Sequence, residues 1–100
     1  MATSTIQQPI PIKMASQTIT NKSATVVLDD GYTMANTIIL GIECKNATGT
    51  VINTQGTQYL SQCRWSAART GIYFLFNVAD YDGGTAVVYY IKAPNKYAFT

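Results

Sequence analysis

Residues 72–92 of this 100-residue chain are IYFLFNVADYDGGTAVVYYIK, and they decide most of what the fold can be. The Asp- and Gly-rich centre, residues 80–84, has the composition of a turn, so two strands joined as an antiparallel hairpin are expected. Apolar and polar residues alternate in a hairpin with one face in water, but here both faces of both strands are apolar. The core of one domain covers one of these faces. We therefore expect another copy of the chain to cover the second.

The alternation of side chains along a strand divides these residues between the two faces. We expect Phe74 and Phe76 to face the core of the domain. The opposite face then meets a neighbouring subunit, and its apolar side chains are Tyr73, Leu75, Val88 and Tyr90. A register shift of one residue would exchange the two faces.

Composition is that of a single β domain, for which a length of 100 residues is sufficient. Charged residues make up 12% of the sequence, about half of the usual share, while the strand-favouring Thr, Tyr, Ile and Val are abundant. A net charge of +2 from scattered basic residues does not form the basic patch typical of nucleic-acid binding. The sequence also has no run of the ~20 apolar residues that a membrane-spanning helix needs. Neither nucleic acid nor membrane insertion is expected.

Four further segments have the composition of strands and are separated by turn residues: 17–20, 24–28, 37–45 and 58–66. The first two are predicted to pair as a hairpin across residues 21–23. In 37–45, alternation places one set of apolar side chains on a single face: Ile38, Leu40, Ile42 and Cys44. With a proline-containing segment near the N-terminus, about seven short strands are expected. We predict an all-β fold, a single small antiparallel β-sandwich or jelly roll over residues 15–100.

Residues 1–14 are predicted to form an extended arm. Proline fixes φ and donates no hydrogen bond, so a segment with two prolines fits an edge strand or an arm lying on a neighbour. The arm therefore adds four residues to the expected subunit interface: Pro9, Ile10, Pro11 and Ile12. Its start lacks the features of a signal peptide, so synthesis in a cytoplasm is expected. There Cys44 and Cys63 are expected to be thiols rather than a disulfide.

Residues with catalytic or metal-binding chemistry are scarce. The chain has no histidine, which removes the commonest general base and the commonest transition-metal ligand. Two cysteines alone do not complete a zinc site. The segment 80–83, DYDG, resembles the start of a calcium loop but lacks the later ligands and is better explained as a turn. No catalytic residue, metal or cofactor is predicted, and an enzyme is not expected.

A small set of side chains has the chemistry of ligand recognition. Trp65 and Tyr81 offer flat amphipathic rings on which a sugar can stack. Arg64 and Arg69 flank Trp65 in the sequence and suit an anionic sugar, whereas a core tryptophan with solvated arginines is the plainer alternative. The predicted ligand or receptor contacts are Tyr81, Asp82, Trp65 and Arg64.

The order of several short motifs resembles a known group of domains. The motifs are DGYT at 30–33, LGI at 40–42, IYFLFNV at 72–78 and TAVVYYIK at 85–92. Over about residues 24–93 this order is similar to the small C-terminal β-sandwich domains of bacteriophage tail, fibre and baseplate proteins. The resemblance implies a non-enzymatic virion structural protein, a homotrimer displayed on the tail or a fibre that contributes to host-surface attachment. It further implies location on the virion surface after synthesis in the bacterial cytoplasm. Implied partners are other virion proteins and, as a further candidate, a host-surface glycan.

Two alternatives arise from how this chain departs from those domains. They typically end a much longer fibre, whereas this sequence has only a short leader before its first predicted strands. A capsid decoration or head-fibre protein that binds and stabilises the shell through the leader is therefore one alternative. A small carbohydrate-binding module is the other, and it requires an exposed Trp65 or Tyr81.

Overall fold

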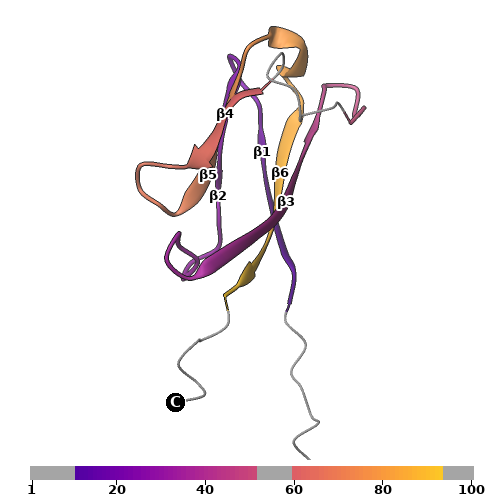
Figure 1. Ribbon diagram of the computed structural model, residues 1–100. Coiled ribbons are helices and arrows are strands. Elements are labelled where there is room, and N and C mark those ends of the chain that lie inside the picture. The colour runs from indigo at the N-terminus through magenta and orange to yellow at the C-terminus, as the bar shows by residue number, and fades with distance from the viewer. Residues whose placement is uncertain (1–10, 52–59, 94–100) are drawn as a thin grey trace, which may run out of the picture.

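The computed structural model describes residues 11–51 and 60–93, which form two antiparallel sheets of three strands each (Figure 1). The elements are β1 (Lys13–Thr18), β2 (Ser23–Val27), β3 (Thr37–Lys45), β4 (Leu60–Trp65), β5 (Gly71–Phe76), the 3-10 helix η2 (Ala79–Tyr81) and β6 (Thr85–Lys92). The strand orders are β1-β6-β3 and β2-β5-β4. The predicted small all-β sandwich is confirmed, with six strands in the described residues. β1 begins inside the predicted arm 1–14, and residues 11 and 12 form no strand.

The predicted hairpin of residues 72–92 is wrong. β5 and β6 do not pair with each other, because each is the central strand of a different sheet. Residues 77–84, which include η2, carry the chain from one sheet to the other. A central position protects the two edges of a strand but not its outer face, and the outward side chains of both strands are only partly buried: Tyr73 and Leu75 of β5, and Tyr89 and Ile91 of β6.

The predicted hairpin around residues 21–23 is half right. Thr20 and Ser23 exchange backbone hydrogen bonds of 2.9 and 3.0 Å, and Asn21 and Lys22 between them have φ of 52° and 64°. Positive φ at both central residues is typical of the type I′ turn of a tight hairpin. The strands then separate, since β1 joins the β6 sheet and β2 joins the β5 sheet.

The core lies between the two sheets. Phe74 and Phe76 of β5 are 0% and 2% exposed, as predicted. Val88 and Tyr90 of β6 are both 0% exposed and belong to the same core, so their assignment to a subunit interface is wrong. Because β6 lies across the core from β5 rather than beside it, the residues predicted for its outer side are those that point inward.

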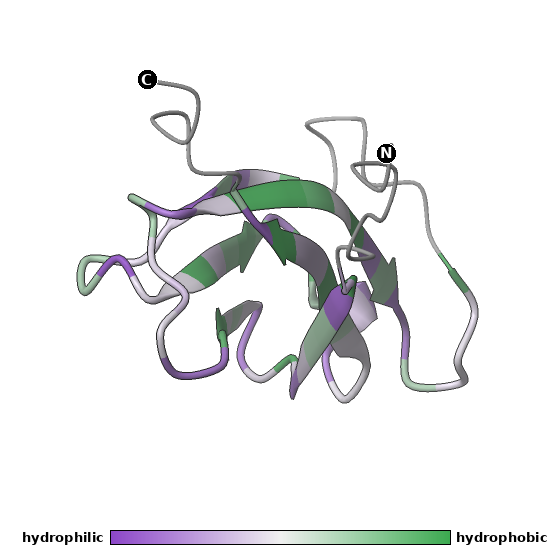
Figure 2. Ribbon diagram, turned by 90° about the horizontal axis from the view of Figure 1, so that it is seen from below, coloured by the Kyte–Doolittle hydropathy of each residue, from purple (hydrophilic) through white to green (hydrophobic). Residues whose placement is uncertain are grey.

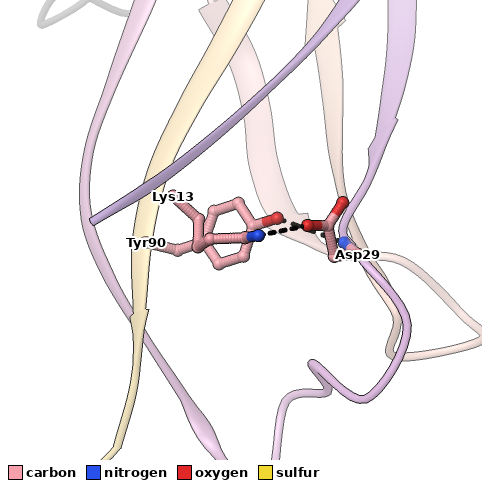
Figure 3. A network of polar contacts seen from close by, with 3 residues as sticks. All are labelled: Lys13, Asp29 and Tyr90. Carbon is pink, nitrogen blue, oxygen red and sulfur yellow. Dashed lines mark hydrogen bonds and ion pairs between the residues drawn. The ribbon is translucent and has the colours of Figure 1, made fainter. Parts of the chain in front are cut away.

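A network of polar contacts closes one end of the sandwich (Figure 3). Lys13 Nζ lies 2.6 Å from Asp29 Oδ2, and the backbone N–H of Asp29 donates a 3.1 Å hydrogen bond to the hydroxyl of Tyr90. The carboxylate of Asp29 raises the pKa of Lys13 through the hydrogen bond and its charge. Lys92 Nζ lies 4.1 Å from the centre of the Tyr32 ring, which meets the Tyr90 ring edge-on. These contacts fasten β1 and β6 to the segment that follows β2.

Removing the hydroxyl of Tyr90 is expected to weaken this end of the fold. Tyr90→Phe deletes the acceptor of the Asp29 N–H and should lower the free energy of unfolding by about 1 kcal/mol, the usual net value of such a bond. Urea unfolding followed by circular dichroism measures the change. Tyr73→Phe, on the outer side of β5, is the control and should stay within about 0.5 kcal/mol of the wild type. Equal stability of Tyr90→Phe and Tyr73→Phe would contradict the role of the hydroxyl.

Candidate interaction surface

A largely uncovered apolar surface lies on the outer side of the β1-β6-β3 sheet, where Val87 is buried and its neighbours along β6, Tyr89 and Ile91, are partly exposed. The register pairs Tyr89 of β6 with Met14 on one side and Gly41 on the other, and it pairs Ile91 with Ile38. Residues paired across antiparallel strands share a face, and this face is opposite to the one that carries Val88 and Tyr90. We call it the outer apolar face, and it consists of Ile12, Met14, Ile38, Leu40, Tyr89 and Ile91.

A β-bulge in β3 brings two of these residues to the surface. The register shifts between Ile39 and Gly41, so that Leu40 and Gly41 both lie opposite Tyr89. Before the bulge Ile38 faces outward, and after it Cys44 faces the core and is 0% exposed. The prediction that Ile38, Leu40, Ile42 and Cys44 share one face is therefore wrong, because the extra residue reverses the alternation halfway along the strand.

The exposure of this face is unusual for apolar side chains so close together. The exposed fractions are 67% for Ile12, 63% for Met14, 42% for Ile38 and 50% for Leu40. Figure 2 shows that hydrophobic segments occur on strands of both sheets. Single exposed apolar residues are ordinary, whereas a contiguous group marks a contact surface. Gly41 adds to this, since a Cβ at its position would meet nothing within 4 Å and the backbone there stays open to a close approach.

Charge is nearly absent from the outer apolar face. On the described strands, the charged residues at its outward positions are Glu43 and Lys45, near one end of β3. They form an ion pair, with Lys45 Nζ at 3.6 Å from Glu43 Oε1. The face therefore has no net charge that would repel a second copy of itself.

The outer side of the other sheet is more polar. Tyr73 and Leu75 lie there and are partly buried, as neighbours of Thr25 and Ser23. The guanidinium of Arg64 lies 5.0 Å from the centre of the Tyr73 ring, and its Nε donates a 3.0 Å hydrogen bond to Gln62. The chain's own side chains thus cover part of Tyr73, so its role at a subunit interface, like that of Leu75, stays a prediction.

Of the four arm residues predicted for the subunit interface, two lie within the described residues and two lie outside them. Pro11 and Ile12 are exposed, and Ile12 extends the outer apolar face beyond β1. Pro9 and Ile10 lie outside the described residues.

The four predicted ligand contacts do not form one site. Tyr81 is 0% exposed and its ring stacks on Phe76 with 4.6 Å between centroids, so its prediction as a surface contact is wrong. Asp82 accepts a 2.8 Å hydrogen bond from the backbone N–H of Lys22 and supports that turn. Trp65 is paired with Ile72 on the inner side of β4 and packs against the core, whereas Arg64 is on the outer side. The burial of Tyr81 could not be predicted from the sequence, because residues 79–81 have the composition of an exposed turn. In the structure, η2 directs the tyrosine inward.

Chemistry is sparse in the part of the chain that the structure describes. No three Cys, Asp or Glu side chains there are grouped as metal ligands. The same residues contain no helix of the length and apolar character that crossing a bilayer requires. Both cysteines are thiols, as predicted. Burial, followed by the nearby Cys63 and Glu43, raises the pKa of Cys44 to about 12, and burial also raises the pKa of Cys63.

The two thiols are expected to react at very different rates. The thiolate is the reactive form, so the raised pKa and full burial should protect Cys44. The pKa of Cys63 is also raised, but its side chain is accessible to the reagent, so it should react. With Ellman's reagent at pH 8, one thiol per native chain should react within minutes and both should react in denaturant. Cys63→Ser should abolish the native reaction and Cys44→Ser should preserve it. Two reactive thiols in the native wild type would contradict the placement of Cys44 in the core.

No family model, no curated protein and no solved structure matches this chain.

Proposed function

We propose that this chain is a non-enzymatic bacteriophage virion protein whose copies assemble through the outer apolar face into a homotrimer. The trimer is displayed on the tail or a fibre and contributes to attachment to the host surface. The observation that carries the proposal is the uncovered face of the β1-β6-β3 sheet, with Met14, Ile38 and Leu40 about half exposed or more. The virion context of the proposal comes from the order of short motifs in the sequence, which resembles that of phage tail and fibre domains.

The energetics of the face favour association. Complete burial of a large aliphatic side chain is worth about 1.5–3 kcal/mol. Covering the exposed parts of Ile12, Met14, Ile38 and Leu40 would therefore contribute roughly 3–7 kcal/mol for each subunit before the entropy of association is subtracted. The ion pair of Glu43 and Lys45 leaves the face without net charge, so no like-charge repulsion opposes its contact with other copies of the chain. Copies of the chain are also the partner present at the highest local concentration in a repeating particle.

The oligomeric state tests the proposal. Size-exclusion chromatography with light scattering at micromolar concentration should give about 33 kDa, three times the 10.9 kDa of one chain. A mass of 10.9 kDa at all concentrations up to 100 µM would overturn self-assembly. In that case we would propose instead that the same face binds a protein of the capsid shell, as expected of a capsid decoration protein.

Host attachment is tested separately. A fluorescently labelled trimer should bind cells of susceptible bacteria. A variant that does not assemble should bind them more weakly, because several linked weak binding sites give a higher overall affinity than one site. Equal binding by the assembled and unassembled forms would show that attachment to cells does not depend on assembly. Absence of binding to any strain that the parent particle infects would overturn the attachment role and leave a purely structural one.

A further inference from the structure

The end of the sandwich where β2 ends carries an open pocket of about 430 Å³. It lies between the segment before β3 and the turn that joins β4 to β5. Its lining residues are Thr33, Met34, Ala35, Ala68 and Arg69. This size falls within the usual range of small-molecule sites. Because a single chain supplies the whole lining, the pocket can bind a ligand whether or not the chain self-associates.

Hydrogen bonds hold the two walls of the pocket together. The backbone N–H of Met34 donates to the carbonyl of Arg69 at 3.0 Å, and the N–H of Leu28 donates to the carbonyl of Thr70 at 3.0 Å. Within the first wall, Asn36 Oδ1 accepts a 2.9 Å hydrogen bond from the N–H of Thr33, and Asn36 Nδ2 donates to the carbonyl of Gly31. The pocket is therefore formed before any ligand arrives.

Arg69 has a backbone conformation that does not suit an arginine. Its φ is 62°, in the left-handed region where glycine and asparagine are the favoured residues. Its N–H donates to the carbonyl of Ser66 at 2.8 Å, which closes the turn without any contribution from the side chain. Residues kept in a strained conformation gather at functional positions, so the strain marks Arg69 as a candidate functional residue.

The charge of Arg69 is not neutralised by the described residues. The ion pairs among them join Lys13 to Asp29 and Lys45 to Glu43, and the guanidinium of Arg69 takes part in neither. The rest of the lining is largely apolar, with the thioether chain of Met34 and the methyl groups of Ala35 and Ala68. A lining residue that carries a guanidinium, among largely apolar neighbours, is suited to a carboxylate attached to an apolar body.

We infer that this pocket binds a small organic monocarboxylate, with the carboxylate on Arg69 and the apolar body against Met34 and Ala68. One guanidinium matches one carboxylate in a bidentate pair, whereas a phosphate with two charges would call for further donors. The ligand class is thus set by a single cation and a lining that supplies few other polar groups.

Methyl NMR of the full chain, labelled with [13C-methyl]methionine, tests the inference. The probes are acetate, hexanoate, benzoate and the neutral benzamide. Hexanoate and benzoate should shift the Met34 methyl signal in a saturable way, with Kd on the order of 1 mM for a ligand of this size. Acetate lacks the apolar body and benzamide lacks the charge, so both should bind at least tenfold more weakly. The Met14 methyl signal, on the outer apolar face, should not move.

Three variants separate the roles of charge and strain. Arg69→Gly should weaken benzoate at least tenfold and at the same time raise the melting temperature, because glycine adopts positive φ without strain. Arg69→Gln keeps the strain, removes the charge and should weaken benzoate equally. Lys22→Gly is the matched control, a second cation at positive φ located at the other end of β2. It should also raise the melting temperature but leave benzoate affinity unchanged.

Several results would overturn the inference. They are the absence of a saturable Met34 shift with hexanoate and benzoate, equal affinity for benzoate and benzamide, and unchanged benzoate affinity in Arg69→Gly or Arg69→Gln. A stabilised Arg69→Gly that no longer binds benzoate would support it, since the wild type would then keep a strained arginine for the sake of its side chain.

Discussion

A chain in which Met14 and Leu40 are both replaced by glutamate is expected to be a folded monomer of 10.9 kDa. Both side chains lie on the outer apolar face, with 63% and 50% of their area exposed, so the monomer should tolerate the change. In the assembly, carboxylates of neighbouring copies would meet in a surface shielded from water, which costs several kcal/mol. We expect the Kd of association to rise at least a hundredfold, a change of about 2.8 kcal/mol. Light scattering over a concentration series measures it.

The matched control for this variant is Val27→Glu. Val27 is 65% exposed and lies on the outer side of the β2-β5-β4 sheet, so it receives the same charge on a surface of similar exposure. It should assemble like the wild type. If Val27→Glu dissociated the oligomer and the double variant did not, the interface would belong to the other sheet, where Tyr73 and Leu75 lie.

Replacement of Gly84 by alanine is expected to have the largest effect on stability. A Cβ at Gly84 would lie 1.9 Å from the carbonyl oxygen of Lys45 and 2.8 Å from backbone atoms of Asn46. These are main-chain atoms at the end of β3, so no side-chain rotation relieves the overlap. The carbonyl of Gly84 also accepts a 2.9 Å hydrogen bond from the N–H of Ile19. A shift of the backbone at Gly84 would break this bond as well. A loss of more than about 4 kcal/mol, or failure to fold at 37 °C, is expected.

Gly41→Ala is the control for this effect, because a Cβ there would meet nothing within 4 Å. Its free energy of unfolding should differ from that of the parent by less than about 0.5 kcal/mol. Both glycine variants are best compared by urea unfolding in the Met14→Glu, Leu40→Glu monomer, which removes assembly from the measurement. A Gly84→Ala chain as stable as Gly41→Ala would contradict the close approach of the two backbones.

The sequence allowed the all-β class and part of the core to be predicted, because these depend on composition and on the period of two. The pairing of strands could not be predicted in the same way. β5 and β6 have the apolar character of central strands, and nothing local to them specifies whether they pair with each other or with more distant strands. Two adjacent apolar strands look like a hairpin when the residues between them form turns. Residues 77–84 instead cross from one sheet to the other.

The candidate surface was harder to predict than the core. Its residues come from β1, β3 and β6, and the bulge at Leu40 and Gly41 reverses the faces of β3 partway along. Alternation alone therefore placed Leu40 with Cys44, which is buried. The apolar character of both faces of β6 is the sequence feature behind the expectation that a second face is covered, and this expectation stays a prediction. The prediction placed Val88 and Tyr90 on the wrong side because it paired β6 with β5, whereas β6 lies across the core from β5.

The strand order has a consequence for the time at which the protein becomes able to assemble. Every pairing in the sheet that carries the outer apolar face is made to β6, since β1 and β3 flank it and do not touch each other's edges. During translation β1 and β3 emerge first but have no partner until residues 85–92 have left the ribosome. An interrupted chain lacks this sheet entirely and cannot present the face to its neighbours. The self-assembly proposed above would therefore be restricted to chains that have been synthesised through β6.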